Sequence, residues 1–187
     1  MLTPGPWRHF CELTLDPNTA NEYFELSENN KKVERVEKDQ SYPDHQDRFE
    51  FHPQLMCSTG LTGRCYWEVQ WSGNVYISVT YRGIMRKGGS EDCWFGGNDQ
   101  SWSLECYEGG YTVWHKNKRR DLPQSSSSSS SGTVSVYVDC PAGCVSFYRV
   151  SSDKLIHIYT FKTTFTEPLF GGFGLYDSGS SVCLCGV

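Results

Sequence analysis

Apolar and polar residues alternate through most of this chain, and the alternation is clearest in residues 63–73. Cys65, Trp67, Val69 and Trp71 occupy every second position there, so a strand would place all four side chains on one face. Each of the two indoles can bury about 150–250 Å². The pattern therefore predicts a strand at the centre of the hydrophobic core.

A second alternating segment, Val75–Tyr81, follows after only Ser72, Gly73 and Asn74. Short connections that contain Gly and Asn commonly join two paired strands. The sequence therefore predicts a hairpin at this point.

Short strands are also predicted at residues 23–27 and 32–36, and the polar character of the second suggests a sheet edge. Residues 37–53 and 82–100 are polar and rich in turn residues, which predicts two long loops. A run of seven serines, Ser125–Ser131, predicts a flexible loop between two strands.

About a dozen short alternating segments are present. No segment has the apolar spacing that would predict a helix of three turns. This pattern is typical of an all-β sandwich or barrel. Two antiparallel sheets packed face to face would cover the apolar side of each strand. Trp67, Trp71 and Trp114 are expected in that core.

The length of 187 residues fits one domain. A net charge of −5 argues against general binding to nucleic acid or anionic membranes. No apolar run approaches the ~20 residues of a membrane-spanning helix, and the N-terminus lacks a signal-peptide pattern. The 9 cysteines lie mostly at strand-like positions, which favours packed thiols in a reducing, cytoplasmic compartment. A disulfide framework is the alternative.

Candidate catalytic and metal-binding residues are few. The pairs Cys140/Cys144 and Cys183/Cys185 could each be half of a zinc site, but no Cys/His pair with ligand spacing completes either set. The chain contains no Gly-x-Ser-x-Gly nucleophile motif. We therefore predict no catalytic residue, no metal site and no cofactor.

Three stretches appear in the order of the signature motifs of the PRY–SPRY domain. They are Leu15-Asp16-Pro17, then Tyr66–Gln70, then Val136–Asp139 followed by Val145–Tyr148. The chain resembles this family over roughly residues 11–187. Two positions depart from the family pattern, because Gln70 replaces an acidic residue and Ser78 stands where many members have glycine.

The resemblance implies a fold of two curved antiparallel sheets, related to concanavalin-like jelly rolls. It also implies an N-terminal extension at residues 1–10, a PRY segment at 11–60 and a SPRY segment at 61–187, with the last two forming one compact domain. Family members have no catalytic centre and bind another protein through loops at one end of the sandwich.

The amino-acid sequence of the chain is most similar to fish versions of the domain. Those versions occur at the C-termini of tripartite-motif ubiquitin ligases, NOD-like receptors and stonustoxin-type pore-forming toxins. The leading hypothesis is a target-recognition domain of a cytoplasmic innate-immune ligase or receptor, monomeric in isolation. A secreted toxin domain and a small-molecule-sensing sandwich are the alternatives.

The second long loop and the strands near it supply candidate partner-binding residues. Exposed aromatic side chains beside basic ones commonly form binding hot spots, and the family's groove draws on neighbouring strands and on a late loop. The expected face comprises Tyr76, Arg86, Lys87, Trp94, Phe95, Trp102 and Phe170. The alternative for Trp94 is that its loop folds back and buries the indole against the sheet.

Overall fold

The computed structural model describes residues 5–123 and 129–184. Within these ranges the chain forms short 3-10 helices and β-strands. The strands are β1 (Phe24–Ser27), β2 (Lys32–Arg35), β3 (Gln54–Met56), β4 (Arg64–Ser72), β5 (Val75–Tyr81), β6 (Ser101–Tyr107), β7 (Gly110–His115), β8 (Lys118–Asp121), β9 (Ser131–Asp139), β10 (Cys144–Ser151), β11 (Lys154–Lys162), β12 (Leu169–Leu175) and β13 (Ser181–Leu184). The 3-10 helices are η1 (Pro6–His9), η2 (Pro17–Thr19) and η3 (Glu91–Cys93).

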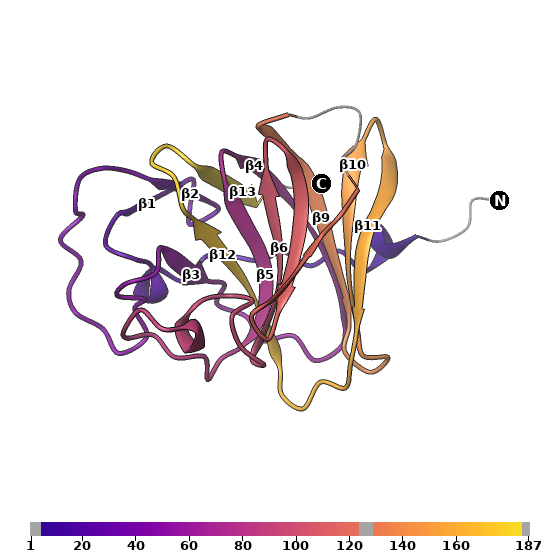
Figure 1. The fold of residues 1–187 in the computed structure, drawn as a ribbon, viewed down its shortest axis with the longest axis horizontal. Coiled ribbons are helices and arrows are strands. Elements are labelled where there is room, and N and C mark those ends of the chain that lie inside the picture. Colours follow the sequence, from indigo (N-terminus) through magenta and orange to yellow (C-terminus); the bar gives the residue numbers. More distant parts are fainter. Residues whose placement is uncertain (1–4, 124–128, 185–187) are drawn as a thin grey trace.

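The strands form two antiparallel sheets. One sheet has 7 strands in the order β1-β2-β13-β4-β9-β10-β11, and the other has 6 in the order β3-β12-β5-β6-β7-β8. Figure 1 shows β10 and β11 at the opposite side of the molecule from β1 and β3. The predicted all-β fold of two antiparallel sheets is therefore confirmed.

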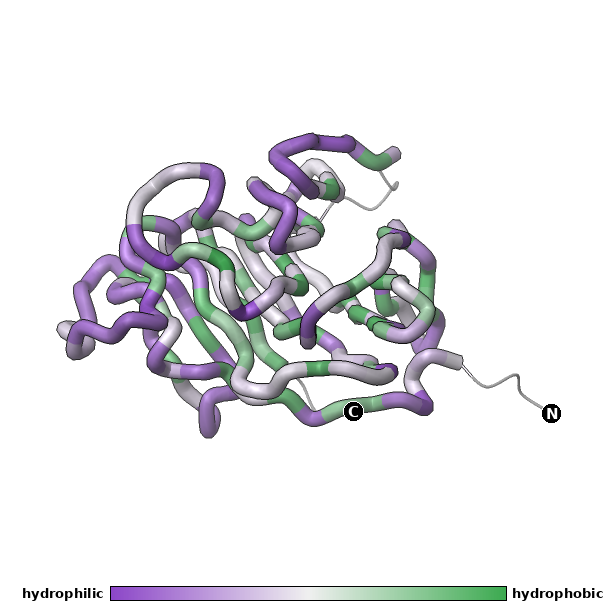
Figure 2. The backbone as a smooth tube through the Cα atoms, turned by 90° about the horizontal axis from the view of Figure 1, so that it is seen from below, coloured by the Kyte–Doolittle hydropathy of each residue, from purple (hydrophilic) through white to green (hydrophobic). Residues whose placement is uncertain are grey.

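The core lies between the sheets, where their apolar faces meet. Trp67 and Trp71 of β4 are buried there, together with Val136 of β9, Phe147 of β10 and Phe173 of β12. The alternation that predicted β4 as a central strand thus reflects burial on one face. Figure 2 shows that many of the hydrophilic stretches lie in the loops outside the sheets.

The connection between β4 and β5 is not a hairpin. The two strands belong to different sheets, so the chain crosses from one layer to the other at Ser72–Asn74. Gly73 adopts a φ of 89°, and a Cβ at this position would collide with Ser180. The crossing therefore requires glycine for its backbone conformation and for the close approach.

Strand β2 is not at a sheet edge, as its polar sequence suggested. It pairs with β1 on one side and with β13 on the other, and Val33 at its centre is fully buried. The first part of the chain thus enters both sheets, because β3 pairs with β12 in the second one.

A second, smaller hydrophobic cluster contains Phe49, Met56, Ile84 and Phe95. It joins the two long loops to β3, so these loops are packed segments rather than free surface loops. Gly172 of β12 makes room for the cluster, because a Cβ there would lie 2.8 Å from the ring of Phe95.

The cysteines depart in one respect from the prediction of packed thiols. Cys11 and Cys65 form a disulfide that joins the N-terminal segment to β4. Spacing along the sequence does not reveal this pair, because 54 positions separate the two residues. The remaining thiols identified as free include Cys57, Cys93, Cys106, Cys140 and Cys144.

Some predictions fall outside the described residues. Most of the serine run, residues 125–128, and Cys185 of the second cysteine pair are among them. Over residues 5–123 and 129–184, no group of His, Cys, Asp and Glu has the arrangement of a metal site. The same ranges contain no helix that is long and apolar enough to cross a membrane.

Candidate interaction surface

The outer face of the six-stranded sheet is built by the strand register. Tyr76 of β5 lies opposite Glu105 of β6, and Glu105 lies opposite Thr112 of β7. Because successive residues of a strand point to opposite faces, these side chains point away from the core residues next to them, such as Ile77 and Val113. The outer face therefore carries both aromatic and polar side chains.

Small residues form a floor on this outer face. Ser78 and Ser103 are buried, and their hydroxyl oxygens are 2.6 Å apart. The second long loop lies against this floor, because Gly96 donates its N–H to Ser101 Oγ at 2.8 Å. A Cβ on Gly96 would lie only 2.5 Å from Cβ of Trp114, so glycine permits the close contact.

Four half-buried aromatic side chains gather above this floor, and we call them the aromatic face: Tyr76, Trp94, Trp114 and Tyr176. The rings of Trp94 and Trp114 are 5.2 Å apart and nearly perpendicular. Trp94 also meets Tyr76 edge to face at 6.4 Å, and Tyr76 lies 4.9 Å from Tyr176. Such edge-to-face pairs stabilise a cluster beyond the effect of area burial.

One carboxylate fixes the orientation of the cluster. Trp114 donates its indole N–H to Glu105 at 3.0 Å. Burial raises the pKa of Tyr76, and the nearby negative charge of Glu105 raises it further. Burial also raises the pKa of Tyr176, with Glu105 as the second cause. Both phenols therefore stay neutral at physiological pH, and their hydroxyls remain hydrogen-bond donors.

One basic side chain of β8, that of Arg119, lies beside the aromatic face. The guanidinium carbon of Arg119 lies 5.9 Å from the ring centre of Trp114. Arg119 also pairs with Asp121 at 2.7 Å, and this hydrogen bond lowers the pKa of the Asp121 carboxyl. The arrangement combines large apolar contact area with positive charge at its border.

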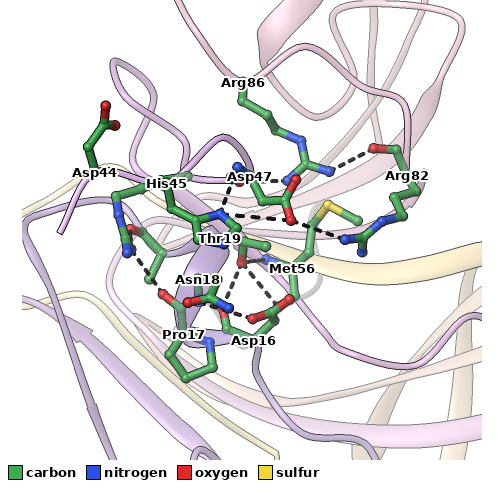
Figure 3. A network of polar contacts seen from close by, with 12 residues as sticks. Asp16, Pro17, Asn18, Thr19, Asp44, His45, Asp47, Met56, Arg82 and Arg86 are labelled. Carbon is green, nitrogen blue, oxygen red and sulfur yellow. Dashed lines mark hydrogen bonds and ion pairs between the residues drawn. The ribbon is translucent and has the colours of Figure 1, made fainter. Parts of the chain in front are cut away.

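The two long loops are joined by Arg86, which is only 9% exposed. Its guanidinium donates to the backbone carbonyls of Ile84 at 3.0 Å, Asp47 at 2.6 Å and Arg82 at 2.7 Å. Burial lowers the pKa of Arg86, and the charge of Asp47 opposes this shift. Figure 3 shows Asp47 lying between the side chains of Arg82 and Arg86. Arg86 is therefore a structural clamp between the loops.

The seven residues expected to form one binding face do not lie together. Tyr76 and Trp94 meet in the aromatic face. Phe95 is fully buried in the second cluster, and Trp102 is 3% exposed in the main core. These two side chains, like that of Arg86, cannot contact a partner without a rearrangement. Their burial separates these three residues from the aromatic face, and their part in partner binding stays a prediction.

The other two members of the expected face lie elsewhere on the surface. Lys87 is exposed and donates to the carbonyls of His45 and Arg48 at 2.9 and 3.1 Å. Phe170 is half-buried, and the guanidinium of Arg82 lies 5.7 Å from its ring centre. Within the described residues, no ring–ring or cation–π contact joins either residue to the aromatic face.

Sequence reasoning missed Trp114, Tyr176 and Arg119. Trp114 was assigned to the core, yet it lies on the outer face with Thr112, while Val113 points inward. The alternation within β7 carries this information. Trp114 lies two positions after the polar residue Thr112, so both side chains point to the same face of the strand. Arg119 lies beside Trp114 because β8 pairs with β7, and the alternating segments of the sequence do not reveal this short charged strand.

Comparison with known proteins places this fold in a family. A profile described as SPRY-associated domain matches residues 13–61, and one described as SPRY domain matches residues 64–186. The chain belongs to the SPRY domain family. The SPRY domain, as found in tripartite-motif proteins, is a protein-interaction module.

Relatives come from two groups of proteins. The chain is 41% identical over 174 residues to stonustoxin subunit beta of Synanceia horrida, covering 92% of this chain and 24% of the toxin subunit. It is 34% identical over 178 residues to tripartite motif-containing protein 16 of Mus musculus, covering 94% and 31%. The chain thus spans about a quarter to a third of the length of these relatives.

Solved structures from both groups of proteins have folds similar to that of this chain. The stonustoxin structure superposes with a TM-score of 0.86 at 38% identity, covering 96% of this chain and 28% of that chain. The crystal structure of the TRIM65 PSpry domain also gives a TM-score of 0.86, at 28% identity, and covers 97% and 93%. The isolated domain of a tripartite-motif protein therefore matches this chain over nearly its whole length.

Proposed function

We propose that this domain is a non-enzymatic recognition module that binds a target protein through the aromatic face. The observation that carries the proposal is a cluster of four half-buried aromatic rings on the outer side of a sheet, with Trp114 bound to Glu105 and bordered by Arg119. Aromatic and Arg side chains dominate binding hot spots. Because the rings are already packed against one another, little side-chain entropy would be lost on binding.

The proposed parent protein is a cytoplasmic innate-immune ubiquitin ligase or receptor, in which this domain would select the target. The similarity to tripartite motif-containing protein 16 favours this candidate, and so do the free thiols at Cys57, Cys93, Cys106, Cys140 and Cys144, whereas the Cys11–Cys65 disulfide argues for an oxidising compartment. The similarity to stonustoxin subunit beta favours a second candidate, a domain of a secreted toxin. The proposed binding face is the same in both cases.

Site-specific photocrosslinking tests the binding face. A photoreactive phenylalanine analogue replaces Trp114 in one variant and Trp7 in another, because Trp7 is 51% exposed but lies in η1 on the N-terminal segment. We expect the probe at position 114 to crosslink to a target protein and the probe at position 7 to crosslink much less. Equal crosslinking from both positions would contradict the proposal.

A further inference from the structure

Strand β8 leaves one edge of the six-stranded sheet open. Among the described residues, 5–123 and 129–184, β7 is the one strand with which it pairs, and the side chains of Lys118–Asp121 are all exposed. Leu122 N–H donates to Tyr111 C=O at 3.0 Å just beyond this strand. In an antiparallel pair, hydrogen-bonded and non-hydrogen-bonded positions alternate. The backbone N–H and C=O of Arg120 therefore point toward β7, and those of Arg119 and Asp121 point away from it.

Outward-facing backbone groups form a template for another strand. By this alternation, the N–H and C=O groups of Arg119 and Asp121 do not pair with β7. An extended peptide beside β8 could exchange N–H···O=C bonds with both residues, as in complexes that add a strand to a sheet edge. Backbone pairing of this kind requires an extended partner but does not specify its side chains.

The charge of β8 restricts the partner further. Lys118, Arg119 and Arg120 are consecutive and only Asp121 opposes them within the strand, although the whole chain has a net charge of −5. The guanidinium of Arg120 lies 5.5 Å from the ring centre of Tyr159 on β11, whereas that of Arg119 lies beside Trp114 on the outer face. Positive charge is thus present on both sides of the edge.

We propose that β8 binds an extended acidic segment of a partner protein as an added strand next to the aromatic face. This inference rests on the proposed function and names the chemistry of its partner. A second copy of the chain fits less well, because two β8 strands would bring six cations together against two carboxylates. Charged residues also protect edge strands from unwanted pairing. The cations of β8 would repel a basic strand but attract an acidic one.

A designed peptide tests the edge without the unidentified partner. The probe is an acetylated and amidated heptapeptide, Thr-Glu-Val-Glu-Val-Glu-Thr, titrated into the isotopically labelled chain by NMR. We expect hydrogen exchange to slow about fivefold or more at the amides of Arg119 and Asp121 and to stay unchanged at Arg120. The same peptide with alternate backbone nitrogens methylated should bind at least about tenfold more weakly, because it cannot pair.

Charge-reversed variants provide the second arm of the test. Lys118→Glu combined with Arg120→Glu should weaken peptide binding about tenfold or more, because attraction becomes repulsion. The matched control reverses Lys154 and Lys162 of β11, the edge strand of the other sheet, and should leave the affinity within about twofold.

Two results would overturn the inference. One is no detectable binding of the acidic peptide to β8. The other is equal binding of the methylated peptide, or of a flexible polyanion of the same charge, because that would show charge attraction without strand pairing. Trp94→Ala separates this inference from the proposed function. If Trp94→Ala abolishes target crosslinking while the peptide does not bind, only the added strand is wrong.

Discussion

Removal of the Arg86 clamp tests how the loops around the binding face are held. The guanidinium makes three hydrogen bonds to carbonyls, and its centre lies 5.0 Å from the ring of Phe49. A hydrogen bond from a charged donor contributes about 1.5–3 kcal/mol, and the cost of holding the cation away from water offsets part of that sum. We therefore expect Arg86→Ala to destabilise the domain by about 3 kcal/mol.

Urea unfolding followed by tryptophan fluorescence measures this change. A loss of about 3 kcal/mol corresponds to a fall in Tm of roughly 6–12 °C for a chain of this size. Arg86→Lys should be intermediate, because one ammonium cannot reproduce the planar fork that reaches three carbonyls. Hydrogen exchange should quicken in residues 43–50, whose carbonyl at Asp47 loses its donor.

Arg82→Ala is the matched control. Its guanidinium is half-exposed and pairs with Asp47 at 3.1 Å, so its loss should cost less than about 1 kcal/mol. If Arg86→Ala is as stable as Arg82→Ala, the three carbonyls are satisfied by water and the clamp is not structural.

Two further predictions concern pH and thiol chemistry. Burial lowers the pKa of His115 below its ordinary value of 6.5, so its contribution to stability is complete above about pH 6.5 and declines as the pH falls through the lower folded value. Thermal unfolding from pH 7.5 to 5.5 should show this decline, and His115→Gln should reduce it; an unchanged pH dependence in the variant would contradict the assignment. Peptide mapping of protein denatured and alkylated without reductant should recover Cys11 crosslinked to Cys65, together with alkylated Cys57 and Cys106. Alkylation of Cys11 in air-oxidised protein would contradict the pairing.

The sequence predicted which residues face the core better than it predicted which strands pair. Alternation identifies the two faces of β4 and β5, because side-chain direction has a period of two. It carries no information on the neighbouring strand, so Ser72–Asn74 read equally well as a hairpin and as a crossing between sheets. Contact with Ser180, more than 100 positions away, accompanies the crossing.

The candidate surface was only partly predictable for the same reason. Tyr76 and Trp94 belong to it, but Phe95 and Arg86 are buried by loops that are distant in sequence. The burial of Arg86 depends on Asp47, which lies 39 positions earlier. Composition marks a loop as rich in aromatic and basic residues, whereas tertiary contacts decide which of those side chains remain exposed.

The most direct test of the central claim is the affinity of a purified crosslinked target for Trp94→Ala compared with Trp7→Ala. Both variants remove one indole, but only Trp94 belongs to the aromatic face. We predict that Trp94→Ala weakens binding by at least ~1–2 kcal/mol, or about tenfold, while Trp7→Ala binds like the unaltered chain. Circular dichroism of both variants verifies that they are folded. Equal affinities of the two folded variants would contradict the assignment of this face as the binding surface.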